Sequence, residues 1–318
     1  MERPLILETK NVNKCYAEHV ALNNINIKIP KESIFGLLGP NGAGKTSLIR
    51  IINQITAPDT GEILIEGNPL NRSHTQDIGY LPEERGLYKK MKVGEQSLYL
   101  AQLKGMNKKD AKSKLIHWFK KFEIEKWWNS KVEDLSKGMA QKIQFITTII
   151  HEPKLLILDE PFSGFDPINT NLVKNEILNL KNSGTSIILS THDMNSVEEI
   201  CDHIALIDNS NKILEGSVSE IKENYSEDLW EVIYKGNVVS FANSVWGGWK
   251  LINQEQISEG LFKCNILLSD NLTLNAFLKG IIDSVEIVGI TKIIPSMNEV
   301  FIKVVEDSKH QTDIVDNE

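Results

Sequence analysis

The sequence has few cysteines, no long apolar run and no excess of positive charge. Its three cysteines, Cys15, Cys201 and Cys264, lie far apart and form no C-x-x-C pair, which favours reduced, cytosolic thiols. No apolar run approaches the roughly 20 residues that span a bilayer, and the N-terminus lacks a signal-peptide pattern. The net charge of −8 argues against a general affinity for nucleic acid or anionic lipid, although local basic patches stay open. We therefore expect a soluble, intracellular protein.

The 318 residues suffice for one large domain and a smaller one. We predict a large α/β domain over residues 1–218, in which a helical pattern from about 87 to 153 forms a subdomain. A polar, turn-rich stretch at 219–228 is expected to be a linker. Residues 229–305 alternate between strand and helix patterns and predict a small α+β domain. The polar tail, 306–318, is expected to be disordered.

A glycine-rich loop between a strand pattern and a helix pattern is the most specific motif. Residues 39–46, Gly-Pro-Asn-Gly-Ala-Gly-Lys-Thr, match the phosphate-binding pattern G-x-x-x-x-G-K-[ST]. Glycines let backbone N–H groups turn inward, and the N-terminus of the following helix adds its positive dipole end. The loop therefore predicts a nucleoside triphosphate site, with Lys45 reaching the β- and γ-phosphates and the Thr46 hydroxyl ligating Mg²⁺.

Two carboxylates, Asp159 and Glu160, follow an apolar run that predicts a strand buried on both faces. Ligands of open α/β sheets bind at this carboxyl end, and desolvated carboxylates need partners. We predict that Asp159 holds Mg²⁺ and that Glu160 orients or deprotonates water. His192 follows the next predicted strand, at the same edge of the sheet, and is a candidate for contact with the γ-phosphate.

Three further places each allow a structural and a functional interpretation. Tyr16 is either a packing aromatic or a ring that stacks on adenine. The acidic pair that begins at Glu83 is either a solvated loop or a group near a metal-bound phosphate. Ser136 and Gly138 form either a capped helix start or a second anion-binding helix N-terminus. Such a second site cannot serve the same phosphate from the same direction as Lys45, which indicates a shared interface.

Taken in order, these motifs resemble the ATP-binding-cassette (ABC) ATPase family over roughly residues 5–218. Six motifs occur in the order of that family: the adenine-stacking aromatic at Tyr16, Walker A at 39–46, the LSGGQ-like signature at 135–139, Walker B with the catalytic glutamate at 155–160, the D-loop at 163–166 and the switch histidine at His192. A signature 19 residues before Leu155 separates this family from other P-loop proteins.

The resemblance implies a RecA-like core, an antiparallel β subdomain and a helical subdomain, with ATP and Mg²⁺ as ligands. The positions implied for ATP binding are Tyr16, Gly39, Pro40, Asn41, Gly42, Ala43, Gly44, Lys45, Thr46 and Ser47. Those implied for Mg²⁺ are Thr46, Asp159 and Glu83. Glu160 and His192 are implied as catalytic residues. Ser136, Gly138 and Asp166 are implied to act across a dimer, on the ATP of a second cassette.

Two places depart from the family pattern. In the signature, Lys137 replaces a glycine and Met139 replaces a glutamine, while Ser136 and Gly138 are retained. Glu83 stands at the position of the Q-loop glutamine. A carboxylate can still ligate Mg²⁺, but it adds negative charge and cannot donate a hydrogen bond. The departure therefore bears on how this loop positions water.

Residues 80–88 and 135–141 are similar to the bacterial subgroup typified by sodium-exporter (NatA-type) ATPase subunits, which carries a C-terminal extension. The resemblance implies a cytoplasmic subunit, peripheral on the inner face of the cell membrane. Its partners would be a second cassette, as a homodimer, and a separate polytopic permease, with no nucleic acid. Three alternatives stay open: a soluble ABC ATPase without a transport partner, a catalytically inactive cassette, and another P-loop phosphotransferase.

Overall fold

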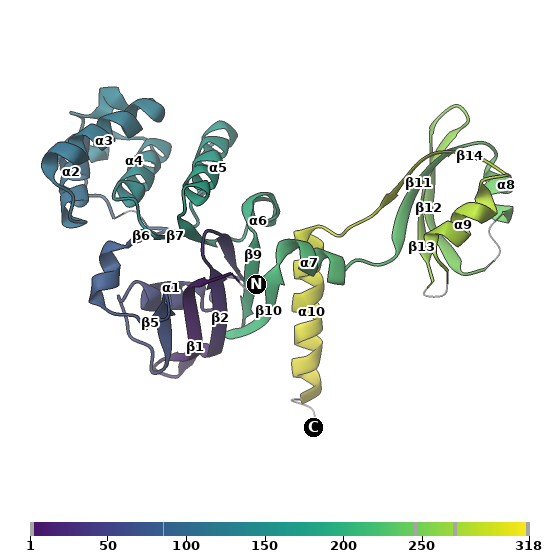
Figure 1. The fold of residues 1–318 in the computed structure, drawn as a ribbon, viewed down its shortest axis with the longest axis horizontal. Helices are drawn as coiled ribbons and strands as arrows, with labels where there is room; N and C mark the ends of the chain where they lie inside the picture. Colours follow the sequence, from purple (N-terminus) through teal and green to yellow (C-terminus); the bar gives the residue numbers. More distant parts are fainter. Residues whose placement is uncertain (1–2, 85, 245–246, 270–271, 316–318) are drawn as a thin grey trace. The chain divides into compact units, whose positions relative to one another are not determined.

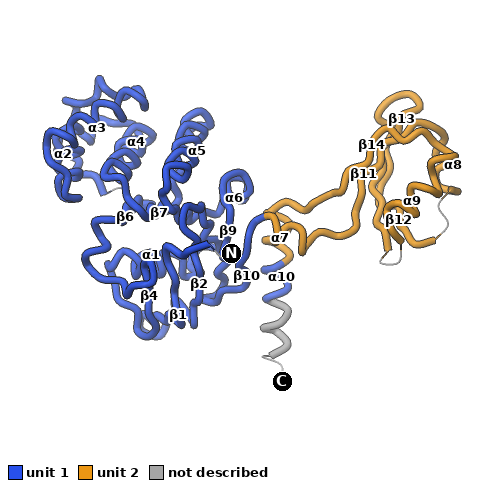
Figure 2. Tube along the Cα trace, in the orientation of Figure 1, with its two compact units in different colours: residues 1–218, 304–318 blue, residues 219–303 orange. Residues whose placement is uncertain are grey.

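The computed structural model describes residues 3–84, 86–244, 247–269 and 272–315. Arg85 in the 80–88 motif and residues 316–318 of the predicted tail lie outside the described residues. The chain divides into two compact units, residues 1–218 with 304–318 and residues 219–303 (Figure 2). Each unit has sheets and a core of its own.

The first unit is built on a six-stranded sheet in the order β10-β9-β3-β8-β7-β6, parallel except for β10. The strand bounds are β3 Ile34–Leu38, β6 Ile78–Leu81, β7 Leu155–Asp159, β8 Ser186–Ser190, β9 His203–Asp208 and β10 Asn211–Ser217. Every residue of β3, β7 and β8 is buried. Because both faces of these strands are covered, the sequence shows them as continuous apolar runs rather than alternating ones.

A second, antiparallel sheet has the order β2-β1-β4-β5. Its strands are β1 Leu5–Tyr16, β2 His19–Pro30, β4 Thr60–Ile65 and β5 Asn68–Pro69. β1 and β2 are each twelve residues long, much longer than the short runs visible in the sequence. Register shifts interrupt their pairing, so the apolar alternation that marks a strand is broken along its length. The β1–β2 hairpin ends by pairing Tyr16 with His19.

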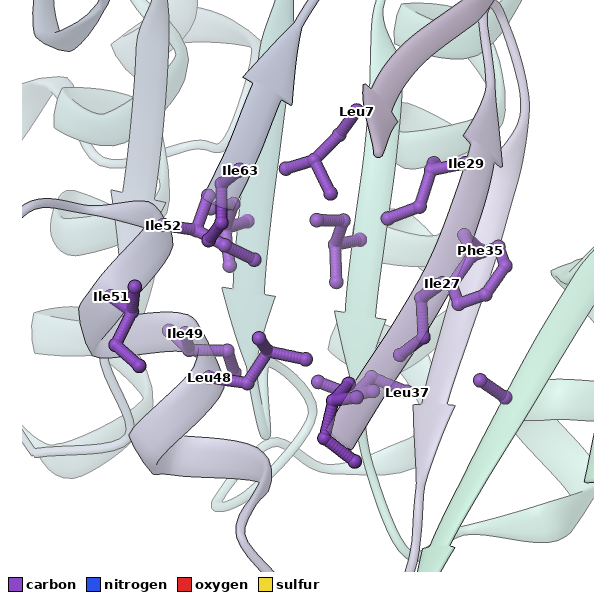
Figure 3. Packing of buried hydrophobic residues seen from close by; sticks show 14 of the residues in the cluster. Leu7, Ile27, Ile29, Phe35, Leu37, Leu48, Ile49, Ile51, Ile52 and Ile63 are labelled. Atoms are coloured by element: carbon purple, nitrogen blue, oxygen red, sulfur yellow. The ribbon is translucent and has the colours of Figure 1, made fainter. Parts of the chain in front are cut away.

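Helix α1, Lys45–Ile52, joins the two sheets. Its buried residues Leu48, Ile49, Ile51 and Ile52 pack in one cluster with side chains of both sheets, among them Leu7 (Figure 3). Burying a large aliphatic side chain contributes about 1.5–3 kcal/mol. This packing fixes the direction of α1, and it thereby fixes the loop that precedes the helix.

Figure 1 shows two further helices, α5 Pro167–Asn182 and α6 Met194–Ile200. Both belong to the first unit. The helical subdomain consists of α2 Val93–Leu103, α3 Lys108–Lys121 and α4 Lys137–Ile149. Three 3₁₀ turns complete the unit: η1 Arg72–Gln76, η2 Glu125–Trp127 and η3 Val132–Asp134. Aromatic rings hold the subdomain together, with Phe119 5.3 Å from Trp128 and Phe122 5.9 Å from Phe145 between ring centroids.

The second unit has an antiparallel sheet in the order β12-β13-β11-β14. Its elements are β11 Leu229–Lys235, α8 Val238–Asn243, β12 Trp249–Ser258, β13 Leu261–Leu268, α9 Leu274–Ile281 and β14 Glu286–Lys292. Tyr234 and Phe241 stack at 4.2 Å in its core, and Phe277 packs edge-on against Phe241. This is the α+β domain that the alternating patterns predict.

Two segments correct the sequence prediction. The expected linker at 219–228 contains helix α7, Val218–Asn224, because Val218 and Ile221 are one helical turn apart and both are buried. The expected disordered tail is also wrong over 306–315, since helix α10 spans Met297–Val315. Met297, Val300 and Val304, in its first half, are buried. A helix that packing has nucleated there can extend into polar sequence at little cost.

Candidate functional site

A pocket of about 280 Å³ lies where the β1–β2 hairpin, the 39–46 loop and the carboxyl ends of three parallel strands meet. It is lined by Tyr16, His19, Ala21, Asn41, Gly42, Gly44, Lys45, Thr46, Ser47, Glu83, Asp159, Glu160 and His192. Segments far apart in the sequence thus converge on one site. Gly39, Pro40 and Ala43 belong to the same loop but are outside the lining.

Two glycines allow the loop to approach its surroundings closely. Gly39 has φ 145°, and a Cβ there would lie 2.0 Å from the Ile207 carbonyl oxygen. Gly44 has φ 115°, and a Cβ there would lie 2.3 Å from the Ala21 carbonyl oxygen. Side chains cannot be accommodated at such distances, and both φ values favour glycine. Gly39 and Gly44 are therefore needed for the backbone path itself.

Lys45 and the start of α1 make the loop end of the pocket cationic. The Lys45 ammonium donates to the carbonyl oxygens of Gly39 at 2.7 Å and Pro40 at 3.0 Å. Burial lowers the pKa of Lys45, while the carboxylates of Glu160, Asp159 and Glu83 oppose that shift. The first turn of α1 carries no acidic residue. Its free N–H groups and dipole are thus available to an anion.

Three carboxylates face this cationic end. Asp159 is 5% exposed, and burial raises its pKa, with the charges of Glu83 and Glu160 adding to the shift. Among the described residues no three metal-ligating side chains converge on a single point. A hard cation such as Mg²⁺ commonly takes only one or two carboxylates and shares the rest of its shell with phosphate oxygens and water. The oxygen donors of Thr46, Asp159 and Glu83 fit that arrangement.

Glu160 and His192, from neighbouring strand ends, form a hydrogen-bonded pair. The Glu160 Oε1 atom lies 2.7 Å from His192 Nδ1 and accepts the His192 backbone N–H at 3.0 Å. Its Oε2 atom accepts the Thr191 hydroxyl at 3.2 Å. Glu160 has φ 48°, and its own N–H donates to the Ser190 carbonyl at 2.8 Å. A left-handed backbone held in this way aims one carboxylate at the pocket, as strained residues at functional sites do.

The hairpin tip supplies a polar and aromatic wall. Tyr16 is 41% exposed and lines the pocket, so it is not a core residue, and its stacking on adenine stays a prediction. His19 and Ala21 also line the pocket. The spacing of the motifs did not predict these two residues as part of the site. Strand pairing could have predicted His19, because a tight hairpin after Tyr16 places His19 directly opposite Tyr16.

Ser136, Gly138 and Asp166 lie outside the pocket lining. The Ser136 hydroxyl accepts the Met139 N–H at 3.3 Å and caps α4, and the Asp166 carboxylate accepts the Asn169 N–H at 2.9 Å and caps α5. The two helix starts are neighbours, since a Cβ on Gly138 would lie 3.8 Å from the Gly164 carbonyl oxygen. We call this area the signature surface, defined by Ser136, Gly138, Gly164, Asp166 and Ile168. Ile168 on it is 82% exposed.

Comparison with known proteins identifies the family. Residues 22–163 match the family described as ABC transporter, and residues 216–305 match the C-terminal domain of DrrA1-3-like ATP-binding proteins. The uncharacterized ABC transporter ATP-binding protein YhaQ of Bacillus subtilis is 46% identical over 222 residues, covering 70% of this chain and 74% of YhaQ. The NatA ATP-binding protein of the same organism is 33% identical over 214 residues, covering 66% of this chain and 87% of NatA. The Nod factor export ATP-binding protein I of Cupriavidus metallidurans is 32% identical over 219 residues (68% and 72%).

A solved structure agrees. The ATP-binding subunit of an ABC transporter is 28% identical and superposes with a TM-score of 0.65, covering 69% of this chain and 93% of that structure. The fold and the comparisons therefore define an ATP-hydrolysing P-loop protein of the ABC class. The chain belongs to the family of ABC transporter ATP-binding proteins and carries a DrrA-like C-terminal domain. At 33% identity, NatA does not establish the sodium-exporter subgroup.

Proposed function

We propose that this chain is the ATPase subunit of an exporter, and that two copies close head to tail around ATP to drive a separate membrane permease. The observation that carries the proposal is the division of the motifs between two places. The pocket contains Lys45, Asp159 and Glu160, whereas Ser136 and Gly138 lie outside its lining on the signature surface. A second copy is needed to bring both sets to one phosphate.

Within one pocket the roles follow from position and charge. Tyr16 stacks on the adenine ring, and the 39–46 loop with Lys45 holds the phosphates. Thr46, Asp159 and Glu83 would hold Mg²⁺, which would supply positive charge beside the phosphates. Glu160 accepts a proton from the attacking water, and His192 keeps that carboxylate oriented and donates toward the transferring phosphoryl group.

Across the dimer, the Ser136 hydroxyl and the Gly138 N–H close over the γ-phosphate of the other copy, and Asp166 lies beside them. A closed dimer would also cover Ile168, which is 82% exposed in one copy, and the burial of this side chain would be favourable. The capping bonds of Ser136 and Asp166 do not oppose this role, since both side chains remain exposed.

A second pocket is a suitable place for a permease to bind, and it supports the proposal of a permease partner. It has about 330 Å³, lies between the end of β6 and helices α2 and α4, and its lining includes Leu87, Leu100 and Leu103. Leu103 is 62% exposed and Tyr88 nearby is 53% exposed. Such an apolar groove suits an inserted segment of a partner protein. None of the described helices has both the length and the apolarity to cross a membrane. We infer that the chain works at the cytoplasmic face through this partner.

Export is inferred from kinship. One relative is named for Nod factor export, and others are named for lantibiotic transport and linearmycin resistance. The sodium-exporter-like motif at 80–88 and the 33% identity with NatA support the same direction. An ABC ATPase without a transport partner is the competing function.

The test is co-purification of the tagged full-length chain from its native cells in mild detergent, with mass spectrometry of the bound proteins. We expect a stoichiometric polytopic membrane protein. The variant Leu103→Glu should lose it while retaining ATPase activity, and the control Ile294→Glu, at a residue 54% exposed in the second unit, should not. Recovery of ribosomes or DNA-repair proteins, or of no partner at all, would favour the competing function.

A further inference from the structure

Charge is distributed very unevenly along this chain. Residues 87–153 contain fourteen lysines, no arginine and seven aspartates or glutamates, a formal charge of +7. The whole chain carries −8, so the remaining residues carry −15. The overall charge therefore conceals a strongly basic helical subdomain inside an acidic protein. Opposite charges separated in this way orient a protein in an electric field.

Helix α3 concentrates this basic charge on one face. Lys109, Lys112, Ile116 and Lys120 follow one another at spacings of three and four residues, and we call this set the α3 basic face. All four side chains are exposed, with Ile116 at 52%. The neighbouring face of the helix, about 100° around its axis, contains Ala111, Leu115 and Phe119 and is buried in the subdomain.

The lysines of the α3 basic face are uncommitted. Of the other lysines on the helix, Lys114 pairs with Glu152 and Lys121 pairs with Glu176. In the described part of the chain, Lys109, Lys112 and Lys120 have no carboxylate within ion-pair distance. Three ammonium groups and one aliphatic side chain thus share an exposed surface that no intramolecular contact explains.

We propose that the α3 basic face binds an anionic lipid surface directly. Each lysine near such a surface contributes attraction equivalent to about a fivefold gain in partitioning. The acidic remainder of the chain does not cancel the attraction between these lysines and the lipid surface, because salt screens charges beyond about 10 Å. Ile116, between the lysines, adds a small apolar contact at the headgroup level. The inference goes beyond the permease contact, since it needs neither ATP nor a second protein.

Nucleic acid is the less favoured partner for this face. Recognition of nucleic acid phosphates favours arginine, whose guanidinium forms paired hydrogen bonds, and the helical subdomain contains none. Single-stranded nucleic acid also requires aromatic platforms for the bases. The α3 basic face has an isoleucine in that place. Lysine with aliphatic side chains is the combination that suits a lipid surface.

The test is co-sedimentation of the purified full-length chain with vesicles, in the absence of nucleotide and of any permease. One set is phosphatidylcholine alone, and the other contains about one-third phosphatidylglycerol. We expect binding only to the anionic set, and loss of that binding at about 0.5 M salt. Replacing Lys109, Lys112 and Lys120 together by glutamine should weaken partitioning about a hundredfold.

The matched control replaces Lys28, Lys250 and Lys279 by glutamine, which changes the net charge equally at exposed lysines elsewhere. This variant should bind the anionic vesicles within about threefold of the wild type. Equal losses in both variants, or no binding by the wild type, would overturn the proposal. So would tighter binding to single-stranded RNA than to anionic vesicles, lost in the same α3 variant. None of these vesicle or RNA results would test the proposed permease contact, because co-purification measures that contact separately.

Discussion

At the scale of residues, the pocket is defined by an excess of negative charge over positive. Glu83, Asp159 and Glu160 face a single lysine, Lys45. The raised pKa of Asp159 has burial as its first cause and the two neighbouring carboxylates as further causes. A triphosphate entering this pocket meets repulsion that a cation has to offset. We therefore propose that the glutamate at position 83 determines how strongly ATP binding depends on the metal.

Glu83→Gln tests that role. Removing one carboxylate should strengthen ATP binding measured in EDTA about fivefold, because one repulsive charge near the phosphates is lost. The same variant should need several-fold more Mg²⁺ for half-maximal hydrolysis, because it lacks one proposed ligand. Glu84→Gln is the matched control, since Glu84 is outside the pocket lining. Unchanged behaviour in both assays would remove Glu83 from the metal site.

The loop glycines allow a second test at this scale. Gly39→Ala would place a Cβ 2.0 Å from a backbone oxygen at φ 145°, whereas Gly42→Ala has φ 83° but no atom within 4 Å. Backbone strain alone costs about 1–3 kcal/mol. In urea unfolding, we expect Gly42→Ala to lower the free energy of unfolding by no more than this strain. Gly39→Ala should lower the free energy of unfolding by clearly more. Equal losses would show that overlap with Ile207 does not constrain the loop.

At the scale of elements, the joint between the helical subdomain and the core contains two half-buried titratable groups, Lys104 and His151. Lys104, after the end of α2, donates to the carbonyl oxygens of Thr75 and Ile78, each at 2.8 Å. His151 follows α4, and burial together with the charge of Lys104 lowers its pKa to about 4. The imidazole is therefore neutral in the folded protein at pH values where it would ionise in the unfolded chain.

This joint predicts a pH dependence of stability. Because the folded pKa of His151 lies below the unfolded value of 6.5, the unfolded chain binds the proton first. The contribution of His151 is fully present above pH 6.5 and is lost as the pH falls toward 4. In urea unfolding, His151→Gln should show a shallower decline of stability over this range than the wild type. Identical slopes would contradict the buried, neutral histidine.

Elements with strong local signals could be predicted from the sequence, and those that depend on tertiary contacts could not. The capped start of α4 could be predicted from Ser136, whose hydroxyl accepts the Met139 N–H. Strand β7 was visible as a continuous apolar run. The full length of the hairpin strands β1 and β2 was not visible, because register shifts interrupt their alternation. The presence of His19 and Ala21 in the pocket could be predicted only if the hairpin was already known. Helix α7 could be predicted only if the burial of Ile221 was already known.

At the scale of the whole molecule, we propose that one cassette holds two incomplete halves of an ATP site. The pocket carries the groups proposed to hold phosphate and activate water, and the signature surface carries a capped, exposed helix start. Every residue predicted to act across a dimer lies outside the pocket lining. We therefore propose that ATP joins two copies of the chain and that hydrolysis separates them again.

The most direct test is light scattering after gel filtration of Glu160→Gln with and without Mg-ATP. The variant should bind ATP with near wild-type affinity, barely hydrolyse it, and shift from one to two chain masses only with ATP. Adding Ser136→Arg should return it to one chain mass while leaving nucleotide binding intact, because Ser136 does not line the pocket. A Glu160→Gln protein that stays at one chain mass with saturating bound ATP would contradict the account.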